Sequence, residues 1–180
     1  MKRRYRYVGP EDIATRVVDG GGGLTANTMG ELRGFLRSFD EYRGGGSLTV
    51  TFTVGVDGSL RVADRRSEHV ACAKGEDVLS AGEMKFSTSD KDDAFVERVT
   101  NQSTGYCPEP EAWEAVARAL DRIAVKRPNF FDPISVFRRC SGCSQIDIVK
   151  DEWCSCGVCD APLPAEWKVK MSRGKSFVRA

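Results

Sequence analysis

Four cysteines near the carboxyl end of this 180-residue chain form two Cys-x-x-Cys pairs. The first pair is Cys140 and Cys143, and the second, twelve residues further on, is Cys156 and Cys159. Each pair can form a tight turn that directs two thiolates at one ion, and two such turns complete a tetrahedral four-sulfur shell, which suits zinc. The total of seven cysteines is odd and excludes complete pairing within one chain, so we expect reduced thiols and a cytoplasmic protein.

The third zinc ligand could be Cys154 or Cys156, because Cys154 precedes Cys156 by only two positions. We favour Cys156, since it has the pair spacing to Cys159 and Gly157 permits the turn between them. Cys154 then remains a competing ligand or a buried free thiol. Four thiolates leave no coordination position for water, so the predicted zinc is structural and not catalytic.

The stretch between the pairs, 144–153, alternates in the manner of a hairpin arm. With the two pairs, residues 138–162 resemble a zinc ribbon, and the resemblance covers only this part of the chain. We expect an α+β domain over 1–136, the zinc ribbon over 137–165 and a basic tail over 166–180.

The sequence before the ribbon predicts helices around an antiparallel sheet. Thr28 and Glu31 have the spacing of a capping box, and residues 48–56 alternate apolar and polar as a strand with one buried face. Asp57-Gly58 is a hairpin signal after that strand. The predicted fold class is α+β, an antiparallel β-meander with flanking helices and the ribbon. Its other elements are helices over 10–18 and 109–125, and strands near 67–73, 77–87 and 94–101.

Charge excludes a general attraction to polyanions, because 27 basic residues face 26 acidic ones, a net charge of +1. No apolar run is long enough for a membrane span, and none follows the basic residues 1–6, so we expect neither membrane anchoring nor a secretory signal. The basic residues of 167–180, with Trp153 and Trp167, make either a nucleic-acid surface or a solvated terminus.

A set of polar residues in the middle of the chain is richer than a sheet requires. It holds the single histidine, a carboxylate beside a glycine in a strand, and a polar loop before a helix. The candidate catalytic residues are His69, Glu83, Asn101, Ser103 and Tyr106. Cys107 is a further candidate nucleophile that His69 would activate.

The spacing of this set resembles a pattern of bacterial polymorphic-toxin and effector-type proteins over residues 65–125. This sequence departs from the pattern at three positions. It has Val70 and Ala71 where the pattern has serines, and Gly105 where the pattern has a second histidine. The resemblance implies a site but no particular reaction. The matching residues are His69, Ala81, Gly82, Glu83, Asn101, Ser103, Tyr106 and Pro108.

We expect a zinc-binding accessory or interaction protein of a bacterial defence- or toxin-related system, with a protein partner and a polar ligand pocket at these residues. One alternative is an enzyme that acts on a nucleotide-like or phosphate-bearing substrate through His69, Glu83 and Tyr106. Another is a nucleic-acid-binding zinc ribbon. The same side chains also have a structural interpretation, in which Glu83 pairs with Arg65, Arg66 or Lys85, and Asn101 and Ser103 cap the turn and the following helix.

Overall fold

The computed structural model describes residues 3–15, 17, 22–40, 46–88, 94–149 and 154–166. The chain divides into two compact units, Met1–Ser135 and Val136–Ala180. The first unit carries the main sheet and its helices, and the second carries the two Cys-x-x-Cys pairs.

A five-stranded sheet with antiparallel pairing forms the first unit, which confirms the predicted α+β class. Its spatial order is β1-β3-β2-β4-β5, so β4 pairs with β2 and not with the preceding β3. This departs from a simple meander, because the chain between β3 and β4 crosses one face of the sheet as a helix. The strands are β1 (Leu24–Ala26), β2 (Ser47–Gly55), β3 (Leu60–Asp64), β4 (Val78–Thr88) and β5 (Ala94–Val99).

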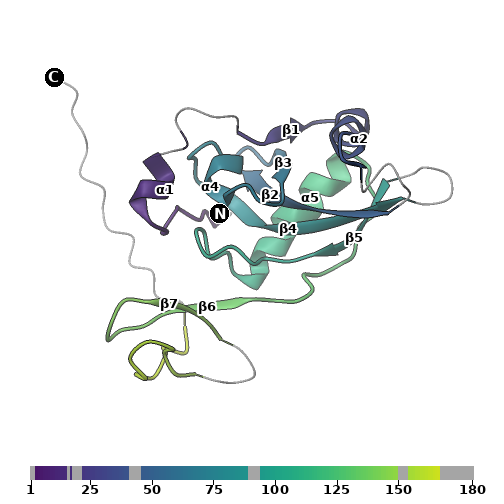
Figure 1. Ribbon diagram of the computed structural model, residues 1–180. Helices are drawn as coiled ribbons and strands as arrows, with labels where there is room; N and C mark the ends of the chain where they lie inside the picture. The colour runs from purple at the N-terminus through teal and green to yellow at the C-terminus, as the bar shows by residue number, and fades with distance from the viewer. Residues whose placement is uncertain are drawn as a thin grey trace. The chain divides into compact units, whose positions relative to one another are not determined.

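One face of β2 is apolar, as its alternation predicts, and Val50, Phe52 and Val54 are fully buried there. The long helix α5 (Trp113–Arg122), which follows the 3-10 turn η2 (Pro110–Ala112), runs behind the strands in Figure 1 and packs against β2, β3 and β4. Its Val116 and Leu120 are buried. The helix expected over 109–125 is therefore confirmed in its central part.

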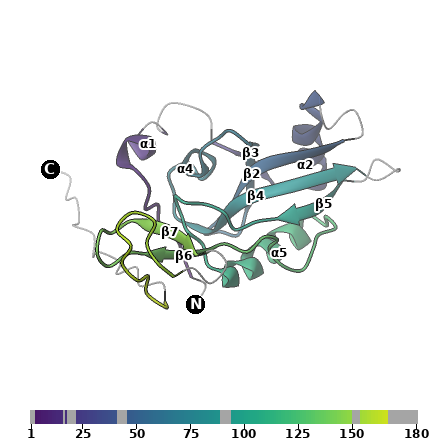
Figure 2. The same cartoon turned by 60° about the horizontal axis from the view of Figure 1, so that its bottom comes forward.

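The opposite face of β2 carries buried threonines and is covered by α4 (His69–Cys72), labelled in Figure 2. The Thr51 hydroxyl lies 3.2 Å from the carbonyl oxygens of Arg65 and Ser67, and the Thr53 hydroxyl lies 3.7 Å from Cys72 Sγ. The strand predicted near 67–73 is wrong. Both edges of β2 are already paired, so this segment satisfies its N–H groups within a helix and crosses the face.

Two further helices flank the sheet, α1 (Glu11–Thr15) and α2 (Met29–Arg37). The capping box at the start of α2 is confirmed: Glu31 N–H donates to Thr28 Oγ1 at 3.2 Å, and Thr28 N–H donates to Glu31 Oε2 at 3.0 Å. Leu32 and Leu36 of this helix are fully buried, and these two side chains anchor it to the core.

The second unit contains an antiparallel pair, β6 (Val136–Arg139) and β7 (Ile146–Val149). The hairpin arm expected in 144–153 corresponds to β7, whereas no strand was expected at β6. Trp153 and the basic residues of 167–180 lie outside the described residues.

Gly82 in β4 lies where the chain following β5 comes unusually close. A Cβ atom at this position would be 2.1 Å from the carbonyl oxygen of Thr100, well inside van der Waals contact. Thr100 N–H donates to the Glu83 carbonyl at 2.9 Å, which fixes the two segments at this separation. The glycine of the Ala-Gly-Glu sequence is therefore required by backbone packing.

We expect Gly82→Ala to lower the free energy of unfolding by about 2–3 kcal/mol, because the new methyl group forces β4 and Thr100 apart. The matched control is Gly34→Ala in α2, where a Cβ would meet no atom within 4 Å. The control should raise stability by about 0.5–1 kcal/mol. Urea unfolding of both variants measures the difference, and equal effects would contradict the close-packing argument.

Candidate functional site

The two Cys-x-x-Cys pairs form turns of the same backbone geometry, here called the first knuckle (140–145) and the second knuckle (156–161). Ser144 N–H donates to the Cys140 carbonyl at 3.0 Å, and Asp160 N–H donates to the Cys156 carbonyl at the same distance. Ser144 and Asp160 also share a positive φ, 63° and 56°. The equal spacing in the sequence thus produces equal local folds.

Each knuckle also contains a hydrogen bond from a backbone N–H group to the sulfur of its first cysteine. Gly142 N–H donates to Cys140 Sγ at 3.3 Å, and Val158 N–H donates to Cys156 Sγ at 3.5 Å. An N–H group directed at a sulfur stabilises negative charge there. Both knuckles are therefore built to hold a thiolate.

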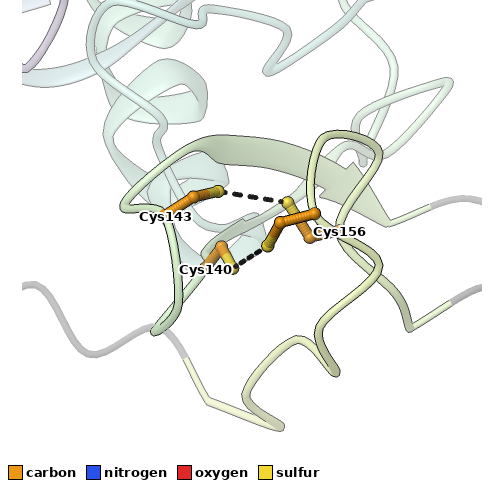
Figure 3. A group of neighbouring side chains, drawn as sticks. Cys140, Cys143 and Cys156 are labelled. Carbon is orange, nitrogen blue, oxygen red and sulfur yellow. Dashed lines mark hydrogen bonds between the residues drawn. The ribbon is translucent and has the colours of Figure 1, made fainter.

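The two knuckles bring together four sulfur atoms, which all lie within 4.8 Å of one another. Cys140 Sγ is 3.5 Å from Cys159 Sγ, and Cys143 Sγ is 3.5 Å from Cys156 Sγ. The labelled cysteines turn their sulfurs inward in Figure 3. A tetrahedron with metal–sulfur bonds of about 2.3 Å has sulfur–sulfur edges of about 3.8 Å. The group could therefore hold a metal ion.

The cluster includes Cys156 and not Cys154, the alternative that the sequence left open. Cys154 is exposed, and its carbonyl accepts a hydrogen bond of 2.6 Å from Leu163 N–H. Ser155, the next residue after Cys154, forms an isolated antiparallel β-bridge with Pro162. These bonds hold the chain before the second knuckle in place, with Cys154 outside the sulfur group.

Proton binding in the cluster is uneven, as expected for crowded thiols. Backbone hydrogen bonds from Cys143 and Gly142 lower the pKa of the Cys140 thiol to about 7. Backbone hydrogen bonds from Val158 and Cys159 act in the same direction at Cys156, but burial, the Cys143 thiol and the Asp147 side chain outweigh them and raise that pKa to about 12. Four thiolates therefore require a cation to neutralise them, and a bound metal would displace the remaining protons.

Of the predicted polar set, His69 and Glu83 lie near each other beside β4. His69 Nε2 donates to the Gly82 carbonyl at 3.1 Å, and burial lowers the pKa of the imidazole although Glu83 acts to raise it. Glu83 Oε1 lies 3.3 Å from Arg65 Nε. The structure thus shows an ion pair between Glu83 and Arg65, one of the three basic partners that the structural interpretation leaves open.

Asn101 is fully buried and joins three parts of the backbone. Its Nδ2 donates to the carbonyls of Pro108 and Ser135, both at 2.8 Å, and its Oδ1 accepts from Ser135 N–H at 2.7 Å. These bonds use the polar atoms of the amide group. The side chain therefore holds the loop before α5 to the segment after it.

Tyr106 and Ser103 are also buried. Tyr106 Oη donates to the Glu76 carbonyl at 2.8 Å, and burial raises the pKa of this phenol. The backbone carbonyl of Ser103 accepts a hydrogen bond from Cys107 N–H. The Ser103 hydroxyl has no hydrogen-bond partner among the described residues. The Cys107 thiol donates to Thr104 O at 3.2 Å. A catalytic role of the five candidates stays a prediction. The side chains of four of them, His69, Glu83, Asn101 and Tyr106, have an identified contact in the fold.

A cavity of about 210 Å³ lies elsewhere in the first unit, and none of the five candidates lines it. Sequence reasoning missed it, because its walls come from the amino-terminal segment, β4 and the start of α5, and no local pattern connects these segments. Its lining includes Arg3, Tyr5, Leu79, Glu111, Ala115 and Arg118.

Comparisons of this chain with protein-family models, with curated proteins and with solved structures found no match. In the part of the chain that the structure describes, no helix has the length and apolar character needed to cross a membrane. Function is therefore inferred from the cysteine cluster and the surroundings of the polar set.

We expect Asn101→Ala to lower the free energy of unfolding by about 3 kcal/mol, because it leaves buried backbone groups of Pro108 and Ser135 without partners. Gln102→Ala, a change in the exposed neighbour, should alter it by less than about 0.5 kcal/mol. Chemical denaturation gives both values. An Asn101→Ala protein of unchanged stability would contradict the structural role.

Proposed function

We propose that this chain is a zinc-binding interaction protein whose metal ion is structural. The observation that carries the proposal is the convergence of four cysteine sulfurs from two equivalent knuckles. A tetrahedral set of four thiolates favours zinc and leaves no open position for water or a substrate. The metal then has the task of folding the second unit and not of catalysis.

The surroundings of the polar set support interaction over catalysis. His69, Asn101 and Tyr106 each donate to backbone carbonyls, so hydrogen-bonding groups that an active site would direct at substrate are used by the fold. The enzyme alternative through His69, Glu83 and Tyr106 is weaker for this reason. The nucleic-acid alternative depends on Trp153 and residues 167–180, which lie outside the described part.

The second knuckle offers a surface for a protein partner. Val158 lies between Cys156 and Cys159, and 68% of its surface is exposed. An apolar side chain that a metal-bound loop holds in solvent is suited to insertion into a partner. The setting we propose, a bacterial defence- or toxin-related system in the cytoplasm, comes from the sequence pattern between His69 and Pro108 and from the reduced thiols.

Purified, reduced protein should contain about one zinc ion per chain, because four thiolates bind it in a closed shell. After exchange to Co²⁺, the wild type and Cys154→Ser should show the intense visible and near-ultraviolet bands of tetrahedral cobalt thiolate. Cys156→Ser should lose much of the thiolate-to-cobalt charge-transfer band. Elemental analysis and absorption spectra test this, and a metal-free wild type would overturn the zinc proposal.

The interaction proposal predicts that capture of a partner depends on the second knuckle and not on the polar set. Val158→Asp should keep the zinc but reduce recovery of the partner by about tenfold or more, as expected for an interface anchor. His69→Gln should capture the partner as the wild type does. Cross-linking and quantitative mass spectrometry with the three baits in an extract of the source cells measure this, and loss with His69→Gln alone would favour the enzyme alternative.

A further inference from the structure

Asp147 is a carboxylate of β7 that contacts the second knuckle. Its Oδ1 accepts a hydrogen bond of 3.1 Å from the backbone N–H of Gly157, the residue after Cys156. Its Oδ2 is buried and has no hydrogen-bond partner among the described residues. No sequence pattern separates Asp147 from the other acidic residues, since its side chain reaches the second knuckle only once the hairpin has formed.

The two knuckles differ in how the chain supports them, and this difference gives Asp147 its importance. Both knuckles close the same backbone bond of 2.8 Å, from Cys140 N–H to the Gln145 carbonyl and from Cys156 N–H to the Ala161 carbonyl, but only the first connects β6 directly to β7. The second knuckle lies outside this hairpin, and its backbone bonds within 154–163 are local. Apart from the sulfur contacts, the bond from Gly157 to Asp147 is the hydrogen bond that joins it to the hairpin in the described part of the chain.

We propose that Asp147 is a positioning residue of the metal centre, which docks the second knuckle on the hairpin and thereby presents Cys156, and not Cys154, to the metal. The inference rests on the proposed zinc site and deepens it. Groups that hydrogen-bond to the loops around metal ligands typically change metal affinity by about 10- to 100-fold when removed.

The charge of Asp147 is not what the site needs. Four thiolates around a divalent cation already carry a net negative charge, and a nearby carboxylate adds repulsion. Arg138 stands opposite Asp147 in the strand register, but no ion pair joins them among the described residues. The useful property of Asp147 is therefore its acceptor oxygen, which an asparagine also provides.

The test compares zinc-loaded wild type with Asp147→Ala and Asp147→Asn. The rate of zinc transfer to a chromophoric chelator is measured, and the alkylated cysteines are identified by mass spectrometry. Asp147→Ala should release zinc about tenfold faster or more, and Cys156 should become alkylated together with Cys154. Asp147→Asn should stay within about threefold of the wild type. Asp160→Asn, which removes a carboxylate from the same knuckle at a positive φ that asparagine tolerates, is the charge control.

Variants of Gly157, the donor of the hydrogen bond to Asp147, provide an independent test. This test also applies if Asp147→Ala does not fold. Gly157→Pro removes the N–H group and should accelerate zinc release as Asp147→Ala does, whereas Gly157→Ala keeps it and should not. In the double variant the Asp147→Ala change should add little, because both changes remove one interaction. Zinc release at the wild-type rate from Asp147→Ala, or full additivity in the double variant, overturns the proposal. A wild type without zinc overturns the metal centre itself, so the two failures are distinguishable.

Discussion

The first unit depends on the close approach of two backbones at Gly82. β4 has β2 on one side and β5 on the other, and the chain leaving β5 returns against Gly82 through Thr100. This contact places Asn101 where its amide can join the loop before α5 to Ser135. The position of α5 on the apolar face therefore follows from a separation that a side chain at Gly82 would not allow.

The same geometry explains why the polar pattern has its spacing. His69 donates to the carbonyl of Gly82, and Tyr106 donates to the carbonyl of Glu76 just before β4. Asn101 holds the two ends of the loop that contains Ser103. Residues that are distant in sequence thus meet around β4 and satisfy backbone groups, so the spacing of these polar residues has a structural basis in this chain.

Local patterns predicted local structure well. The alternation of β2, the capping box of α2 and the paired cysteines each depend on residues within one element or turn, and each is found. The strand prediction for the α4 segment is wrong, because these residues also suit a strand and only the full pairing of β2 decides against it. The surroundings of Asn101 and Asp147 depend on contacts between distant segments, which no local pattern contains.

The two units have different sources of stability, and this difference connects the metal to function. The first unit buries a large apolar core. Among the described residues of the second, the buried cluster is Cys140, Cys156 and Leu163, with Val149 and Ala161 packed against it, and Phe137 is also buried. On the proposal that the four cysteines bind zinc, ligation of the metal adds to these few apolar contacts and offsets part of the entropy lost when this unit orders. On the same proposal, the surface around Val158 depends on thiolates that are reduced and metal-loaded. A partner that recognises the second knuckle would therefore bind the metal-loaded form alone, even though it never touches the metal.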